Sequence, residues 1–232
     1  MSAEATPRPH AAHPPALAHH FESLDQQHDA ATLGMWVFLA TEVMIFGAIL
    51  AAYAVYRASY PAEFHAASGR LKVGLGGTNT LVLIGSSLMM AFAVRSAQLG
   101  NGRLASDFML LTIALGVVFL GIKAFEWYDE YRETLVPLPA FGFSKEWEST
   151  LSVPHVKLFF VFYFILTGLH ALHMVIGVAI LGVLSVKARR GRYDAEYNDP
   201  VEVGGLYWHF VDIVWIFLFP LLYLVGTRES FF

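Results

Sequence analysis

The stretch Tyr207–Trp215, YWHFVDIVW, places a histidine and an aspartate inside an apolar segment that continues to about Val225. A segment of this length and hydrophobicity is typical of a helix that spans a membrane. An ionisable side chain inside a bilayer costs roughly 2.5–3.5 kcal/mol on insertion scales, so it persists only with a partner. We therefore expect His209 and Asp212 to mark a polar pathway or a contact between subunits.

The whole chain has the composition of a membrane protein. Of its 232 residues, 56% are hydrophobic and only 15% are charged, and the mean hydropathy is +0.52. Soluble domains carry about 25% charged residues. Runs long enough to cross a bilayer as helices lie at about 33–56, 78–99, 107–129, 155–186 and 204–227. The predicted fold class is all-α: a polytopic membrane protein with a bundle of five transmembrane helices, in one domain over residues 31–232.

The first thirty residues differ from the rest. Prolines and histidines alternate there without an apolar run, so we expect residues 1–30 to form a flexible cytoplasmic tail whose histidines are solvated rather than metal-bound. The net charge of −4 gives no reason to expect a nucleic-acid partner. Because the chain has no cysteine, disulfides, thiolate-ligated iron–sulfur clusters and a cysteine nucleophile are excluded.

Charge in the connecting segments predicts the orientation. Four basic residues crowd the link between the fourth and fifth spans, namely Lys187, Arg189, Arg190 and Arg192. Basic clusters next to membrane spans favour the cytoplasmic side. Since the number of spans is odd, the N-terminus is expected to be cytoplasmic and the C-terminus outside.

Three further polar residues lie deep in the expected spans. Glu42 is nine residues into the first span, roughly 13 Å deep at the rise of a helix. It is either a carboxyl that exchanges protons or faces a partner, or a protonated acid that locks helices together, and both interpretations stay open. His170 and His173 share one face of the fourth span. Their spacing suits metal or haem, but because no further ligands are evident, hydrogen bonding between helices is favoured. The estimated depths of Glu42, His173 and Asp212 allow the three side chains to form one cluster, and we state this cluster as a hypothesis.

The remaining candidates lie near the expected interfaces. Glu126 is close to the outer end of the third span, three residues after Lys123, and we expect a structural ion pair worth a few tenths of a kcal/mol. His209 is expected near the cytoplasmic interface, and Lys187 at the cytoplasmic end of the fourth span, where both can meet lipid headgroups. We predict no catalytic residue and no metal site in this chain.

Taken in order along the chain, five stretches resemble one family. They are Thr41–Phe46, Asn79–Thr80, Phe125–Tyr128, Gly168–His173 and Trp208–Trp215. Across about residues 33–230, the chain resembles cytochrome c oxidase subunit III of the haem–copper oxidase superfamily. It is similar to the five-span form, which lacks the first two of the seven spans of longer members and the lipid-filled cleft beside them.

This resemblance implies an accessory core subunit of a terminal oxidase in a bacterial-type plasma membrane. The haem and copper are then expected in partner subunits, with direct packing against catalytic subunit I, further contacts with subunit II and other subunits, and bound phospholipid. The implied role is to support proton uptake and stability of subunit I. By the same resemblance, Glu42 matches a carbodiimide-reactive membrane carboxyl and Lys187 a position that contacts lipid headgroups. His173 and Asp212 match motif positions without an implied catalytic role.

Other interpretations remain open at this point. Within the superfamily, subunit III of a quinol oxidase or a homologue associated with nitric-oxide reductase has the same span pattern. The alternative from a different class is an autonomous proton or metal transporter. Against it, the chain lacks the paired, broken helices that often mark transporter sites. A membrane cytochrome b with His170 or His173 as an axial ligand needs a second histidine at matching depth, and His209 is too shallow.

Overall fold

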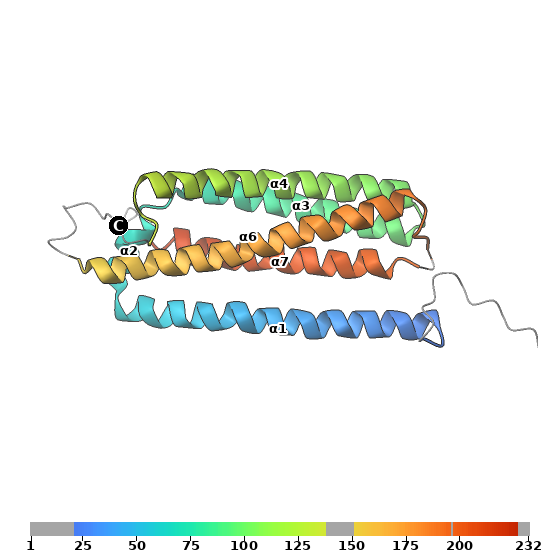
Figure 1. The fold of residues 1–232 in the computed structure, drawn as a ribbon, viewed down its shortest axis with the longest axis horizontal. Coiled ribbons are helices and arrows are strands. Elements are labelled where there is room, and N and C mark those ends of the chain that lie inside the picture. Colours follow the sequence, from blue (N-terminus) through green and yellow to red (C-terminus); the bar gives the residue numbers. More distant parts are fainter. Residues whose placement is uncertain (1–20, 138–150, 196, 227–232) are drawn as a thin grey trace, which may run out of the picture.

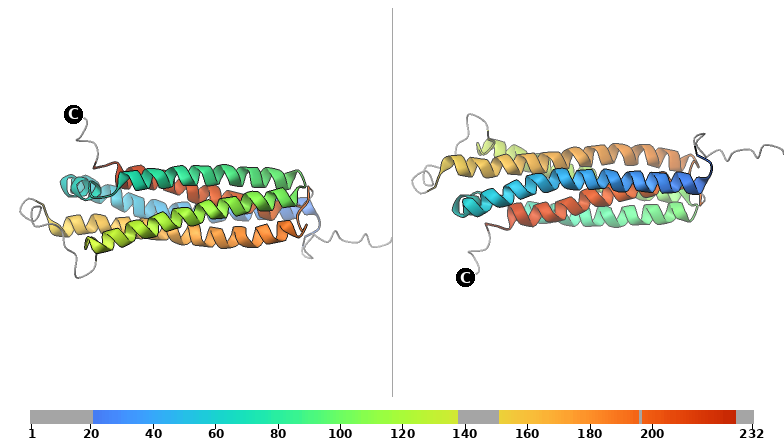
Figure 2. Two further views of the ribbon diagram at one scale, coloured as in Figure 1. Left: turned by 90° about the horizontal axis from the view of Figure 1, so that it is seen from above. Right: turned by 90° about the horizontal axis from the view of Figure 1, so that it is seen from below.

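A computed structural model describes residues 21–137, 151–195 and 197–226. These residues form five long helices and one short helix without a strand, which confirms the predicted all-α class. The helices are α1 (Leu24–Ser59), α2 (Pro61–Ser68), α3 (Val73–Gln98), α4 (Gly102–Arg132), α6 (Val153–Arg189) and α7 (Asp199–Tyr223). The five long helices lie side by side, and the start of α1 and the end of α7 are at opposite ends of the bundle (Figures 1 and 2).

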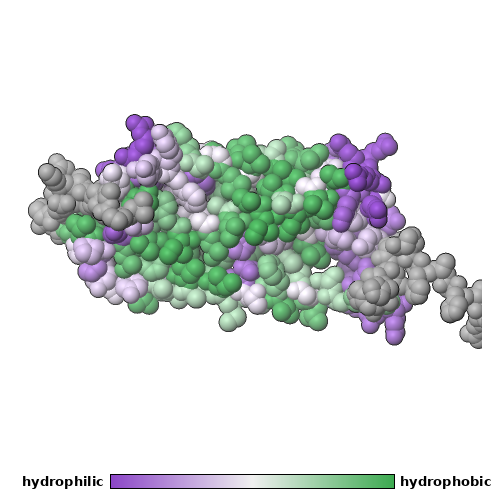
Figure 3. All heavy atoms as spheres, in the orientation of Figure 1, coloured by the Kyte–Doolittle hydropathy of each residue, from purple (hydrophilic) through white to green (hydrophobic). Residues whose placement is uncertain are grey.

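All five long helices are apolar and long enough to cross a membrane. Most extend beyond the expected spans, because helical structure continues past the apolar run into polar turns. The longest, α6, has 37 residues and therefore measures about 55 Å, well beyond the hydrocarbon thickness of about 30 Å. A central apolar belt, with hydrophilic residues gathered at both ends, is visible in Figure 3.

The first helix starts earlier than the expected domain boundary at residue 31. It begins at Leu24, because the Ser23 side chain accepts a hydrogen bond from the backbone N–H of Gln26 and caps the helix. His28, expected in a solvated tail, lies within α1, and its Nδ1 is 2.7 Å from Oδ1 of Asp199 at the start of α7. Hydrophobicity alone does not reveal a capped polar turn. The rest of the expected tail, residues 1–20, lies outside the described residues.

The short helix α2 packs across the end of the bundle and was not predicted. Its Ser68 hydroxyl donates to the carbonyl of Leu222 at 2.6 Å, and the Tyr53 hydroxyl of α1 donates to the carbonyl of Leu221 at 2.6 Å. The last carbonyls of a helix have no partner within it. These two side chains therefore satisfy the end of α7, which stops at Tyr223 rather than near residue 227.

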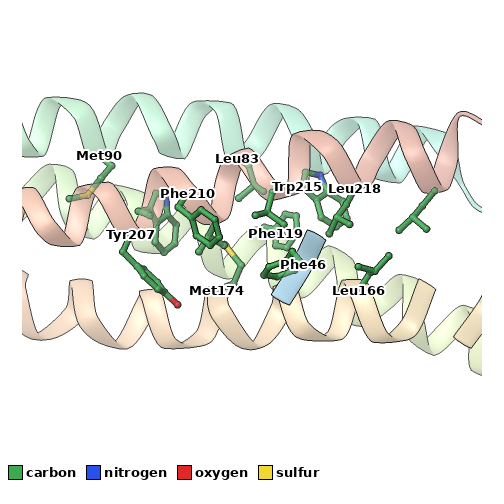
Figure 4. Close-up of a cluster of buried hydrophobic side chains, with 14 of the residues drawn as sticks. Phe46, Leu83, Met90, Phe119, Leu166, Met174, Tyr207, Phe210, Trp215 and Leu218 are labelled. Carbon is green, nitrogen blue, oxygen red and sulfur yellow. The ribbon is translucent and has the colours of Figure 1, made fainter. Parts of the chain in front are cut away.

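The centre of the bundle is built around α7. Half of its most apolar stretch is buried, against 17% for α1, the most peripheral of the long helices. Trp208 of α7 lies fully buried where Gly116 of α4 and Gly177 of α6 leave room: a Cβ added at these glycines would lie 2.7 Å and 3.0 Å from its ring. Figure 4 shows the neighbouring aromatic core, including Phe119 and Trp215.

Candidate functional site

Glu42 and His173 form a hydrogen-bonded pair between the peripheral helix α1 and helix α6. Nε2 of His173 lies 3.0 Å from Oε2 of Glu42. The side chains are only 10% and 13% exposed, respectively, so the pair is largely shielded. The tilted ring of Phe46, at 5.4 Å from the His173 ring, covers it from α1. The Tyr207 hydroxyl of α7 donates to the His173 carbonyl at 3.1 Å, which ties all three helices together.

The hydrogen bonds of His173 determine how many protons this pair holds. Nδ1 lies 2.8 Å from the carbonyl oxygen of Leu169, and since a carbonyl only accepts, Nδ1 must carry a hydrogen. In a neutral ring Nε2 is then an acceptor, and the Glu42 carboxyl must be protonated to donate to it. In the alternative, an imidazolium donates to a carboxylate. Either way, one proton lies between two side chains on different helices, which is the arrangement of a proton-exchanging or a helix-locking contact.

Lys123 and Glu126 form the expected ion pair within a second polar cluster, but the pair is buried in the bundle rather than weak and exposed. Nζ of Lys123 is 2.9 Å from Oε2 of Glu126, but both side chains are almost completely buried, at 2% and 1% exposure. The lysine also donates to the hydroxyls of Tyr163 at 3.1 Å and Tyr223 at 2.8 Å, while Tyr223 donates to Oε1 of Glu126 at 2.6 Å. All three lysine hydrogens are used.

Disrupting such a cluster should cost much more folding free energy than disrupting an exposed pair, because a buried charge without partners costs several kcal/mol. The sequence missed it because Tyr163 and Tyr223 come from α6 and α7, 40 and 100 residues beyond Lys123. The available signal was a lysine within an apolar run with tyrosines in two other spans. The cluster joins three helices.

His170 does not join His173. It is 1% exposed and lies between the rings of Phe119 and Trp215, at centroid distances of 5.4 Å and 5.1 Å. Neither ring nitrogen has a hydrogen bond in the structure. The expected hydrogen bond between helices is therefore formed by His173 and not by His170. Among the described residues, no group of three or more histidine, aspartate or glutamate side chains is placed to hold a metal ion.

Asp212 lies apart from the Glu42–His173 pair, so the three-residue cluster is wrong in its third member. It is 3% exposed and lines a cavity together with Ser87 and His209. The reason is its direction on α7: five residues beyond Tyr207, which contacts α6, it is rotated by about 140° at 100° per residue. The hypothesis that Glu42 and His173 lie at the same level of the bundle agrees with their hydrogen bond, but the direction of the Asp212 side chain was not predicted.

The last two candidates differ in their surroundings. His209 is half-buried, and its Nδ1 lies 2.7 Å from the Ser87 hydroxyl of α3, so it faces a neighbouring helix rather than only headgroups. Lys187 is exposed in the last turn of α6. Its neighbour Arg189 bonds to Asp107 of α4 at 2.6 Å. Ser87 was not a candidate, because a hydroxyl in an apolar span is usually satisfied by its own helix.

The fold and these polar contacts define a class: a multi-pass helical membrane protein whose buried ionisable groups link helices. Residues 140–227 match the family model described as cytochrome c oxidase subunit III. The chain is 30% identical over 207 residues to cytochrome c oxidase subunit 3 of Thermostichus vulcanus, covering 88% of this chain and 92% of that protein. The chain therefore belongs to the cytochrome c oxidase subunit III family of the haem–copper oxidases.

Two further relatives show the range of the family. One is the heme-copper oxidase subunit I+III of Aeropyrum pernix, 30% identical over 203 residues that make up 85% of this chain and 23% of that longer protein. The other is the probable quinol oxidase subunit 3 of Staphylococcus aureus, 26% identical over 210 residues, or 90% of this chain and 96% of that protein. Membership in this family places the chain in an oxidase complex.

Proposed function

We propose that this chain is an accessory subunit of a haem–copper terminal oxidase, without a redox centre of its own. It packs directly against catalytic subunit I, where haem and copper reduce oxygen, and it supports proton uptake and stability there. The fused relative supports the contact, because its name joins subunits I and III in one polypeptide. Haem and copper belong to the partner subunits, and bound phospholipid meets Lys187 at the end of α6.

The observation that carries this proposal is the single-proton pair of Glu42 and His173. It joins α6 to the helix with the least buried surface, and α1 presents large apolar side chains outward, among them Val43 and Met44, which are 58% and 74% exposed. Outward apolar side chains suit lipid or another membrane subunit. A proton shared at this edge serves either to exchange protons near the catalytic subunit or to hold α1 in place for docking.

The test is the variant Glu42→Gln in the assembled oxidase. The amide keeps the size of the side chain, but it cannot exchange a proton with His173 as a carboxyl can. We expect an assembled complex with normal haem absorbance, a fall in oxygen uptake of less than about twofold, and faster loss of activity during turnover. Glu133→Gln is the matched control, since Glu133 forms an exposed pair with Arg70. Complete loss of activity in an intact complex would contradict an accessory role.

Affinity purification in mild detergent separates this function from the alternatives. Co-purifying haem–copper subunits and oxygen uptake support the accessory role. A lone, colourless chain favours a transporter, and a lone chain with haem absorbance favours a cytochrome. Because relatives carry both cytochrome c oxidase and quinol oxidase names, the same eluate is assayed with each electron donor.

The proposed location is a bacterial-type plasma membrane with a cytoplasmic N-terminus and an external C-terminus. The basic cluster at the end of α6 supports this orientation. The sequence has no cysteine, so a single cysteine at Ser23, before the start of α1, or at the exposed Ser59, at the end of the same helix, gives an unambiguous label. A membrane-impermeant maleimide applied to intact cells should label the second variant and not the first, and the reverse pattern would invert the orientation.

A further inference from the structure

A cavity between α3 and α7 contains polar groups that the proposed function does not use. Its volume is about 410 Å³, and its walls are apolar except at Ser87, His209 and Asp212. Two of its lining side chains, Leu88 and Ile213, are 52% and 50% exposed. The cavity is therefore open at the side of the bundle, between exposed apolar side chains.

A second cavity continues the first toward one end of the bundle. It has a volume of about 330 Å³, shares Ala91 and His209 with the first, and ends beside Arg95 and Glu202. From Arg95 to Ile84, which lines the deeper cavity, the chain of α3 rises roughly 16 Å. Because the two cavities share lining residues, they adjoin and form one crevice, which is mostly apolar along α3, has Ser87, His209 and Asp212 partway along it, and ends at charged side chains.

The polar groups of the crevice have unused hydrogen-bonding capacity. Asp212 is 3% exposed, neither of its carboxyl oxygens has a hydrogen bond of ordinary geometry, and the neighbouring Ser87 hydroxyl that contacts it is shared with His209. Buried polar atoms without partners are rare and costly. His209 uses Nδ1 toward Ser87, and its Nε2 has no hydrogen-bond partner in the described part of the chain. Three residues apart on α7, His209 and Asp212 lie on the same face with Cβ atoms roughly 5–6 Å apart.

We propose that this crevice binds a membrane-dissolved amphiphile whose head group is a hydroxyl, either an aliphatic alcohol or a phenol. When Ser87 donates to Nδ1 of His209, Nε2 carries the hydrogen. One hydroxyl then accepts from Nε2 and donates to Asp212, whose side chain rotates toward the cavity. The apolar tail fills the remaining volume. Pockets of this size, mostly apolar with a few convergent polar groups, are typical small-molecule sites.

A diacyl phospholipid fits the polar part of this crevice poorly. Its esters and phosphodiester only accept hydrogen bonds, so these groups cannot accept from His209 and also donate to Asp212. A hydroxyl is both donor and acceptor. The site is independent of the Glu42–His173 pair, because Asp212 points to another side of α7.

The experiment uses the complete chain in its oxidase complex, reconstituted in lipid nanodiscs. Hexadecanol carrying a diazirine in its chain is photolysed there, and the labelled residues are identified by mass spectrometry. We expect labels on the lining of the crevice in α3 and α7. Unlabelled hexadecanol should compete at a concentration about tenfold lower than hexadecyl methyl ether, which has no donor. A 4-alkylphenol as competitor distinguishes phenols from alcohols.

Variants then test the polar groups separately. Asp212→Leu and His209→Leu should each weaken labelling about tenfold, whereas Thr41→Val, which removes an exposed hydroxyl on α1, should leave it unchanged. Equal competition by the alcohol and the ether would overturn the proposal and leave only an apolar groove. Labels spread evenly over all helices, or a crevice covered by another subunit, would overturn it too. The comparison of alcohol with ether needs no variant, so it holds even if a variant fails to fold.

Discussion

Replacing Lys123 by methionine should reveal how strongly the buried polar cluster holds the bundle together. Methionine has a similar length and no charge, so α4 keeps its packing while the cluster loses its cation. Glu126 then loses its cationic partner and keeps the Tyr223 hydroxyl, and the Tyr163 hydroxyl loses the lysine as a partner. The variant thus leaves a buried carboxyl without a counter-charge.

The size of the effect follows from burial. Removing one member of a buried ion pair typically costs about 3–5 kcal/mol, because the remaining charge is uncompensated. Replacing both members by apolar residues is often nearly neutral. We therefore expect Lys123→Met to destabilise the chain by about 3–5 kcal/mol and the double variant Lys123→Met, Glu126→Leu to recover most of this loss. The two single effects should be strongly non-additive.

The assay is equilibrium unfolding in mixed micelles, followed by tryptophan fluorescence, for both single variants, the double variant and a control. The control is Arg189→Met, which breaks an ion pair with Asp107 whose side chains are 60% and 57% exposed; its effect should be close to zero. If Lys123→Met costs less than about 1 kcal/mol, or if the single effects simply add, the cluster is not a coupled buried network.

Two further changes probe the core. Gly116→Ala should destabilise by about 1–3 kcal/mol, because its Cβ would lie 2.7 Å from Trp208, whereas Gly121→Ala on the same helix meets nothing within 4 Å and should be neutral or slightly stabilising; thermal unfolding of the pair checks this, and equal effects would refute it. His170→Leu should not reduce the melting temperature, because it removes two buried nitrogens without hydrogen bonds; a clear decrease would indicate that His170 has a partner in the complex.

In this protein the sequence predicts the level of a polar side chain along the bundle better than it predicts the direction of that side chain around its helix. The number of long helices follows from apolar length, and the proximity of Glu42 and His173 follows from counting 1.5 Å per residue. The direction of a side chain around its helix is harder, because a membrane helix is apolar on all sides and has no polar face to orient it. Asp212 therefore fell at a suitable depth but on the wrong side of α7.

Contacts formed by several helices are equally hidden. The chain around Lys123 contains only Glu126 as an obvious partner, and a pair of this spacing near a span end is usually exposed. What buries it is the arrival of Tyr163 and Tyr223 at the same level, which depends on how α6 and α7 pack against α4. No local sequence pattern determines at which level the two tyrosines lie, so the cluster cannot be predicted without the packing of the helices.

The peripheral helix α1 is attached by polar contacts with other helices. It buries little apolar surface, and in a membrane apolar surface gives little drive for helices to associate. Instead, within the described part of the chain, hydrogen bonds join it to other helices at points spaced along its length: His28 to Asp199, Glu42 to His173, and Tyr53 to the carbonyl of Leu221. At the helical rise these lie roughly 21 Å and 16 Å apart, so they fix α1 at its start, middle and end. Because the middle contact lies in the apolar part of the bundle, breaking it, as in Glu42→Leu, would loosen α1 at its centre while both ends stay attached.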